Sequence, residues 1–236
     1  MNSPDEKIFQ NREHSGEPAI LRRKEDPFVL MYHGTIVERH GLDLAVWALS
    51  KIKRMIPRLE LRIYGSATPF LGEVMRHVQI LDLGDVVHYF GPKTLEQISD
   101  AIVECDIGII PNRRNEFTEL NMPTRIFEYL SQGKPVIAPK TSGILEYFGA
   151  NELLLFDEAN SEELAAQIEY AYWHPAQLAE TVRRGQQVYR AHKWSAERLR
   201  FLGLVQDVVN RRERPSGRTK ILPDDVRMAD SKSSLG

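Results

Sequence analysis

The chain has 236 residues, of which 42% are hydrophobic and 27% charged, and this is the composition of a globular protein with room for a sizeable core. Its formal net charge of −2 excludes a bulk attraction to nucleic acid or to anionic membranes, although a local basic patch stays open. The single cysteine, Cys105, excludes an intramolecular disulfide and a cysteine metal cluster.

Residues 1–26 are polar and charged, and we interpret them as a linker or N-terminal arm. They contain no basic segment followed by an apolar one, so the sequence predicts no signal peptide. No apolar run in the chain approaches the roughly 20 residues that span a bilayer. We therefore expect a cytoplasmic protein without a transmembrane segment, for which peripheral membrane association stays open.

From Phe28 onward, short apolar runs alternate with stretches of helical period. The runs predict strands at 28–34, 59–66, 86–91, 106–111, 134–139 and 153–156. The periodic stretches predict helices at 42–56, 71–84, 95–105, 124–133, 144–149, 161–173, 176–192 and 194–212, the last capped by Ser195. This alternation predicts an α/β fold, a doubly wound, Rossmann-like parallel sheet with helices on both faces. We place that domain at 27–212 and expect a disordered tail at 213–236, because the tail lacks periodicity.

In such sheets ligands bind at the carboxyl ends of the strands. The first loop of this kind holds Gly34 and Thr35, followed by Arg39, His40 and Gly41. A glycine there lets the backbone approach a ligand, and the following helix N-terminus favours anions. Arg39 and His40 add candidate contacts to a phosphate. The residues alone also fit a plain turn with solvated charges.

The second candidate is the segment PTRIFEYLSQGKPVIA, residues 123–138. Arg125 and Glu128 are three positions apart and share one face of the expected helix, whereas Phe127 and Leu130 should pack into the core. A carboxylate near a helix start can accept hydrogen bonds from the vicinal hydroxyls of a sugar. A solvated ion pair on the helix surface fits the same residues.

Other chemistries have little support in the sequence. The seven histidines are scattered, and only His33 and His40 lie near an expected ligand loop, so we predict no metal site. No motif of a covalent nucleophile is present. Lys93, Arg113 and Arg114 fit a basic rim, although such charge runs usually form solvated faces.

A family resemblance changes the balance between these alternatives. The segments HGTIVERHGLDLAVWAL, LRIYGS, VVHYFGPKTLEQISDAIVECDIGIIP, MPTRIFEYLSQGKPVIA and SGILE occur in one order. Together, from about Pro4 to Arg211, they resemble the nucleotide-sugar-binding C-terminal half of the family-four retaining glycosyltransferases, which have the GT-B architecture. The segment P-x-[KR]-x-F-E-Y-x-x-x-G-K-P-V-I-A is the specific part, and the others support it through their order.

The resemblance implies donor-binding roles for particular residues. Glu128 matches the glutamate that binds the ribose hydroxyls of the donor, and Gly34 and Thr35 match the loop that faces its diphosphate. The further matches are the basic side chain, Arg39 or His40; the nucleobase segment from Tyr89 to Gly91; and a neighbouring loop with Thr141, Ser142 and Gly143.

The sequence also departs from the family pattern. Leu120 stands eight positions before Glu128, where many members carry a second glutamate. Thr35 and His40 stand where arginine and lysine are usual, which leaves Arg39 as the permanent charge of that loop. We therefore hypothesise that Arg125 acts as a second cation, because a guanidinium forks onto phosphate oxygens. Arg39, His40 and Arg125 are the expected catalytic residues.

The resemblance implies the donor side of a metal-independent, retaining glycosyl transfer that uses a nucleoside-diphosphate sugar and needs no cofactor. The chain starts where the junction between the two GT-B domains would lie, so we expect an acceptor-binding N-terminal domain or a partner chain, and no nucleic acid. One alternative is a non-catalytic, nucleotide-sugar-binding partner subunit. The other is an unrelated flavodoxin-like or regulatory domain, which would need an acidic cluster or a flavin loop at the strand ends.

Overall fold

A computed structural model describes residues 3–12, 26–157 and 159–213 of the chain. Two compact units are present, Met1–Arg198 and Leu199–Gly236, and the sheet belongs to the first. Within the segment interpreted as an arm, Phe9 is only 2% exposed and lies among buried residues of the sheet domain. Most of the tail expected to be disordered, 214–236, lies outside the described residues.

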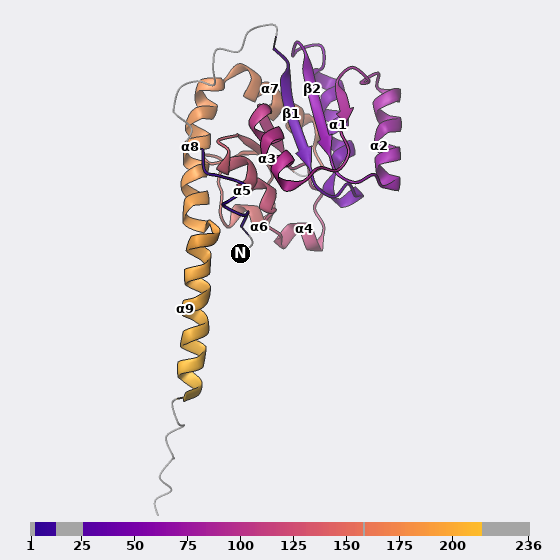
Figure 1. Cartoon of the computed structure of the whole chain (residues 1–236). Coiled ribbons are helices and arrows are strands. Elements are labelled where there is room, and N and C mark those ends of the chain that lie inside the picture. Colours follow the sequence, from indigo (N-terminus) through magenta and orange to yellow (C-terminus); the bar gives the residue numbers. More distant parts are fainter. Residues whose placement is uncertain (1–2, 13–25, 158, 214–236) are drawn as a thin grey trace, which may run out of the picture. The chain divides into compact units, whose positions relative to one another are not determined.

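The described part contains a six-stranded, fully parallel sheet with the order β3-β2-β1-β4-β5-β6, which confirms the predicted fold class. Figure 1 shows the strands of this sheet between the helices. The order reverses at β1 and β4, which is the position where ligands bind in doubly wound sheets. The strands are β1 (Phe28–His33), β2 (Leu59–Tyr64), β3 (Val87–Tyr89), β4 (Ile107–Ile109), β5 (Val136–Pro139) and β6 (Leu154–Phe156).

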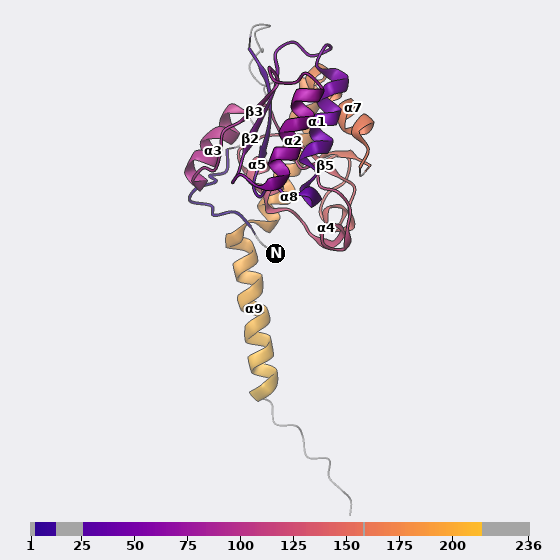
Figure 2. The ribbon, with the colours of Figure 1, turned by 90° about the vertical axis from the view of Figure 1, so that its right-hand side faces the viewer.

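Helices cover both faces of the sheet, and Figure 2 shows α3 on one side of the strands with α1 and α7 on the other. The longer helices follow the predicted ranges within a few residues. They are α1 (Leu42–Ile52), α2 (Pro69–Ile80), α3 (Leu95–Glu104), α5 (Thr124–Ser131), α7 (Ser161–Trp173), α8 (Pro175–His192) and α9 (Trp194–Glu213). None of the described helices has a stretch long and apolar enough to cross a bilayer.

Four local predictions were wrong. The loop expected before α5 contains a short helix, α4 (Glu116–Leu120), and the first ligand loop contains the 3-10 helix η1 (Glu38–His40). The helix expected at 144–149 is α6 (Ser142–Leu145), shifted toward the N-terminus. Ser195 does not cap α9, because it lies inside the first turn and its backbone N–H bonds to the carboxylate of Glu6.

Alternating side chains of β1 reach the two halves of the core. Leu30 and Tyr32 belong to the cluster under α1, α2 and α7, whereas Met31 belongs to the cluster under α3, α5 and α8. His33, two residues after Met31, continues that second face, and its ring packs against Tyr129 of α5. The polar end of β1 therefore points at α5.

Helix α5 packs closely on the strands. Phe127 and Leu130 are fully buried, which confirms their expected core positions. The hydroxyl of Tyr129 donates a hydrogen bond of 2.8 Å to the carbonyl of Met31. A Cβ on Gly108 would lie 2.4 Å from the Tyr129 ring, so only glycine lets the helix approach β4 this closely. Arg125 and Glu128 are thus fixed beside the carboxyl end of β1.

Candidate functional site

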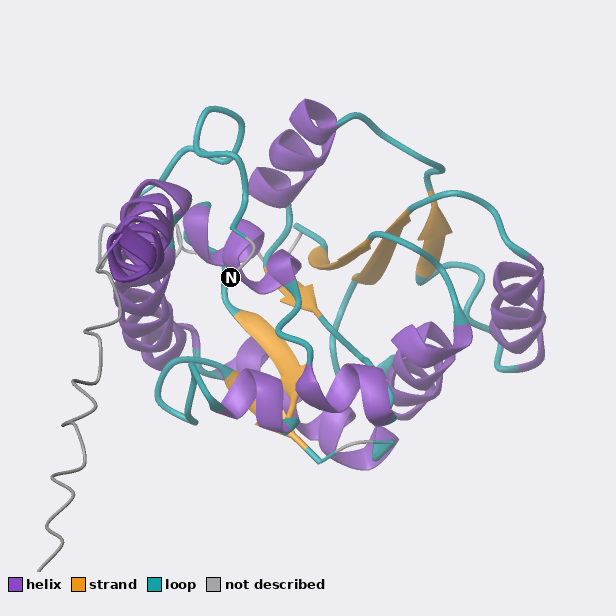
Figure 3. Cartoon of the chain, turned by 90° about the horizontal axis from the view of Figure 1, so that it is seen from below, coloured by secondary structure: helices purple, strands orange, loops and turns teal. Residues whose placement is uncertain are grey.

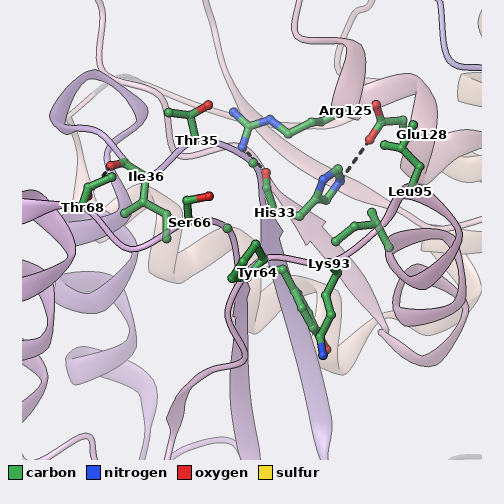
Figure 4. A pocket seen from close by; sticks show the side chains of 14 residues that line it. His33, Thr35, Ile36, Tyr64, Ser66, Thr68, Lys93, Leu95, Arg125 and Glu128 are labelled. Atoms are coloured by element: carbon green, nitrogen blue, oxygen red, sulfur yellow. Dashed lines mark hydrogen bonds and ion pairs between the residues drawn. The ribbon is translucent and has the colours of Figure 1, made fainter.

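A cavity of about 430 Å³ opens at the carboxyl ends of β1, β2 and β3, and α5 forms one wall. Figure 3 is seen from below, toward the edge at which the strands end, and Figure 4 shows the side chains of the cavity. The predicted residues that line it are Gly34, Thr35, Arg125 and Glu128. Further lining residues include His33, Tyr64, Gly65, Ser66, Thr68, Pro92, Lys93, Leu95 and Ile98.

A second hollow of about 330 Å³ is formed by side chains of α2 alone, namely Glu73, Arg76, His77 and Ile80. It lies on the surface of one helix and away from the switch between β1 and β4. We assign the site to the first cavity, because three strand ends and two opposite charges converge there.

Two glycines let the loops after β1 and β2 meet at the cavity. Gly34 has φ +121°, a backbone conformation that other residues rarely adopt, and the side chain of Arg125 lies over it. A Cβ on Gly65 would lie 2.2 Å from the carbonyl oxygen of Gly34. The close backbone approach expected of Gly34 is therefore present, and it brings the Arg125 guanidinium to the strand end.

Arg125 is held by uncharged groups. Its Nη1 donates to the carbonyl of His33 at 2.7 Å, and its Nη2 donates to Oδ1 of Asn112 at 3.3 Å. The guanidinium carbon lies 5.0 Å from the centroid of the Tyr32 ring. In the part of the chain that the structure describes, Arg125 forms no ion pair with a carboxylate. Its positive charge thus remains available to an anion in the cavity.

Glu128 stands in the same cavity beside a buried histidine. Its side chain is 14% exposed, and its Oε2 lies 3.3 Å from Nε2 of His33 (Figure 4). Burial raises the pKa of the Glu128 carboxyl to about 7, although the charge of Arg125 opposes this shift. Burial also lowers the pKa of His33 to about 3, and Arg125 adds to that effect, so the ring is neutral at pH 7.

Arg39 and His40 do not line the cavity. They belong to η1, and the Arg39 guanidinium carbon lies 5.5 Å from the centroid of the Phe117 ring. Nδ1 of His40 lies 2.7 Å from the carbonyl oxygen of Thr35, so His40 shapes the loop that faces the cavity. Burial lowers the pKa of His40, and the charges of Arg125 and Arg39 lower it further, whereas the hydrogen bond to Thr35 raises it.

Tyr89 and Gly91 border the cavity without lining it. The Tyr89 hydroxyl donates to the carbonyl of Gly65 at 2.8 Å, and the Gly91 carbonyl accepts a hydrogen bond from the Gly65 N–H at 3.1 Å. They fix the loop after β2, and the chain then continues into the cavity at Pro92 and Lys93. Of the three basic side chains of the expected rim, Lys93 is the one in the cavity.

Ser142 and Gly143 do not line the cavity and pack against α4. The backbone N–H of Ser142 bonds to Glu119 at 3.2 Å, and its hydroxyl bonds to the same carboxylate. A Cβ on Gly143 would lie 2.7 Å from the backbone of Leu120. Hydrogen bonds from Arg114 and Ser142 lower the pKa of Glu119 to about 2, so this carboxylate is charged.

Sequence reasoning passed over two residues of the site. His33 was noted only for its position near a ligand loop, and Asn112, which is 2% exposed and bonds Arg125, was not noted at all. The pattern FVLMYH contained a signal, because a histidine in the alternating buried run of a strand needs a polar partner. Among the described residues, no group of three or more His, Cys, Asp or Glu side chains could hold a metal ion.

Comparisons with known proteins agree with this geometry. The family model of the glycosyl transferases group 1 matches residues 15–188. No curated protein matches the chain. Solved structures do match its fold, at identities that are informative about fold alone, and the chain spans about half the length of most of those named below.

One such structure is Anabaena Alr3699/HepE in complex with UDP and glucose, with 18% identity, a TM-score of 0.67, and coverage of 80% of this chain and 49% of that one. Another is the sucrose-phosphate synthase of Thermosynechococcus elongatus, with 21% identity, a TM-score of 0.71, and coverage of 89% and 52%. The C-terminal domain of the group 1 protein LpcC from Francisella tularensis is covered over 100% of its length, by 81% of this chain, with 17% identity and a TM-score of 0.64.

Proposed function

Because the chain belongs to the glycosyl transferases group 1, we propose that its strand-end cavity binds a nucleoside-diphosphate sugar as the donor of a retaining glycosyl transfer. The observation that carries the proposal is the convergence of Gly34, Arg125 and Glu128 on one cavity. Similar folds also have structures with such ligands: Alr3699/HepE has been crystallised with UDP-glucose, and pneumococcal GtfA with UDP and GlcNAc.

Each part of the donor has a chemically suited group in the cavity. The diphosphate would lie against the Arg125 guanidinium and the backbone of Gly34 and Thr35. The ribose hydroxyls would donate to the carboxylate of Glu128. The nucleobase would lie toward the segment after β3, where Leu95 and Ile98 supply apolar walls.

The catalytic contribution of this domain would be stabilisation of the leaving group. In a front-face transfer, the bond between the anomeric carbon and the diphosphate oxygen breaks while the acceptor oxygen bonds to the same face of that carbon. The acceptor proton passes to the departing phosphate oxygen. Arg125 would stabilise the charge that develops on the diphosphate, with Arg39 and His40 supporting the loop that faces it. An acceptor site on another domain or on a partner chain completes this proposal.

A second candidate function is a non-catalytic subunit that binds the nucleotide sugar without transferring it. The observation that favours it is the position of η1, since Arg39 lies over Phe117 and His40 is bonded to the carbonyl of Thr35. Of the three expected catalytic residues, Arg125 alone lines the cavity. This candidate predicts nucleotide binding without hydrolysis or transfer of the sugar.

A thermal-shift panel with UDP, GDP, ADP and thymidine diphosphate tests the binding proposal. A nucleotide present at 100 times its Kd should stabilise the domain by about 2.7 kcal/mol. Thymidine diphosphate lacks the 2′-hydroxyl and should bind more weakly than the matching ribonucleotide. The absence of any shift with all four would overturn the proposal. Release of free sugar from the matching nucleotide sugar would then separate the enzyme from the binding subunit.

A further inference from the structure

His33 lines the cavity, and the proposed donor contacts give it no role. It is the last residue of β1, it is 5% exposed, and its ring lies 5.1 Å from that of Tyr129, edge to face. Placing a polar ring at a buried position costs free energy unless the ring has a polar partner. The cavity contains one candidate partner for its Nε2.

That partner is the carboxylate of Glu128, 3.3 Å away. The two atoms are close but not aligned as a hydrogen bond, and Nε2 is otherwise without a partner in the described structure. A neutral imidazole that carries its proton on Nε2 can donate to a carboxylate without adding charge. Hydrogen bonds of this kind often become shorter and straighter only when the ligand is bound.

The backbone carbonyl of His33 binds the positively charged Arg125. Its carbonyl oxygen accepts the 2.7 Å hydrogen bond from Nη1 of Arg125. Arg125 and Glu128 are three positions apart on α5, a spacing at which opposite charges commonly pair. In the described structure they form no ion pair with each other, and Figure 4 shows them directed to two different parts of His33. One residue thus keeps the two charges apart.

We propose that His33 is a positioning residue of the donor site. Its imidazole orients the Glu128 carboxylate toward the ribose hydroxyls, while its carbonyl orients the Arg125 guanidinium toward the diphosphate. This inference rests on the proposed function, since it assigns the two charged groups to the ribose and the phosphates. It adds that selectivity for ribose depends on a side chain that does not itself contact the sugar.

The test compares His33→Leu and His33→Gln with the wild-type chain. Leucine removes the donor, whereas the glutamine amide restores one at the end of a side chain of similar reach. Calorimetry would measure the affinities for UDP, for 2′,3′-dideoxyuridine 5′-diphosphate and for inorganic diphosphate. If the panel identifies another base, the same pair of nucleotides is used with that base.

Wild-type protein should bind the ribonucleotide at least about tenfold more tightly than the dideoxy analogue, because a hydrogen-bonded, charged group would lose its partners. His33→Leu should reduce this ratio to near one and leave the affinity for inorganic diphosphate within about twofold. His33→Gln should recover most of the ratio. A general loss of structure would instead weaken the binding of all three ligands to a similar extent.

The possible outcomes distinguish the proposed function from the role of His33. A wild-type chain that binds none of the nucleotides overturns the proposed function and this inference with it. A wild-type chain that discriminates between the two sugars, together with a His33→Leu variant that discriminates equally well, overturns the role of His33 alone. A loss of inorganic diphosphate binding in His33→Leu equal to the loss of UDP binding also overturns it.

Discussion

Two regions at the carboxyl ends of the strands differ in the partners of their charged side chains. Where β1 meets α5, Arg125 is held by a carbonyl and an amide, and Glu128 lies beside a neutral imidazole. Where α4 meets α6, Arg114 is bonded directly to Glu119, which also binds Ser142. A ligand can bind a charged side chain whose partners are neutral without breaking an ion pair. A side chain in an ion pair must first be separated from its partner. The first region therefore has the properties of a binding site, and the second those of a structural junction.

The largest effect expected from this comparison follows the change Arg125→Ala. It removes a cation that has no acidic partner among the described residues. Nucleoside-diphosphate affinity should therefore fall roughly 100-fold, the loss expected for a hydrogen-bonded charge pair. Isothermal titration calorimetry with the best nucleotide of the panel measures it. Unchanged affinity would remove Arg125 from the site.

Arg183→Ala provides the matched control. Arg183 lies on α8, is half exposed and pairs with Glu180 on the same helix, outside the cavity. Its removal deletes the same charge from the protein and should leave nucleotide affinity within about twofold. Equal losses in both variants would indicate a non-specific effect of net charge rather than a contact in the cavity.

The next effect concerns stability, when Glu128 is changed to glutamine. Burial raises the pKa of this carboxyl from its ordinary value of 4.5 to about 7, so the folded state binds more protons than the unfolded state between these values. Stability therefore falls as pH rises from about 4.5 to 7 and stays lower above it. Glu128→Gln lacks this penalty and should be more stable than wild type by about 3 kcal/mol at pH 8.

Urea unfolding of both proteins at pH 5 and pH 8 checks this prediction. The difference between the variant and the wild type should be small at pH 5 and should grow toward pH 8. A glutamine variant that is less stable than wild type at pH 8 would mean that the ionised carboxylate has a stabilising partner in the folded protein. The raised pKa of the Glu128 carboxyl would then be wrong.

A modest effect is expected from Arg39→Ala. This side chain lies over Phe117 outside the cavity, so its charge acts on the diphosphate only through the loop that contains Thr35. Affinity for the nucleotide should fall less than about threefold in the same titration. A loss as large as that of Arg125→Ala would show that η1 rearranges around the ligand. It would favour glycosyl transfer over the function of a non-catalytic binding subunit.

The smallest effect is expected from Ser142→Ala. The hydroxyl and the backbone N–H of Ser142 already bind the carboxylate of Glu119, and the residue does not line the cavity. Nucleotide affinity should stay within about twofold of wild type, while the thermal midpoint should fall because the junction of α4 and α6 loses a hydrogen bond. A large loss of affinity would extend the site across both regions.

The same comparison explains what the sequence predicted and what it did not. The period of α5 and the apolar run of β1 predicted both elements, and the burial of Phe127 and Leu130 followed from that period. Gly34, Thr35, Arg125 and Glu128 lie together because these elements pack against each other. In regular helices and strands the buried side chains recur at a fixed spacing, and a single sequence is enough to show that spacing.

The α4 region lacked such repetition. Its start depends on Asn115, whose side chain accepts hydrogen bonds from the backbone N–H groups of Phe117 and Thr118. The helix has five residues, too few for a periodic pattern. The pairing of Glu119 with Ser142 joins positions 23 residues apart. Contacts between such distant positions form only in the folded chain, so the residues next to Ser142 in the sequence could not predict its position.

The most direct test of the central claim is a crystal structure of the chain with UDP, or with the nucleotide that the panel selects, at pH 8. We predict both ribose hydroxyls within hydrogen-bond distance of the Glu128 carboxylate, and the diphosphate against the Arg125 guanidinium and the Gly34 backbone. A nucleotide bound at the α4–α6 junction, or one whose ribose lies away from Glu128, would contradict it.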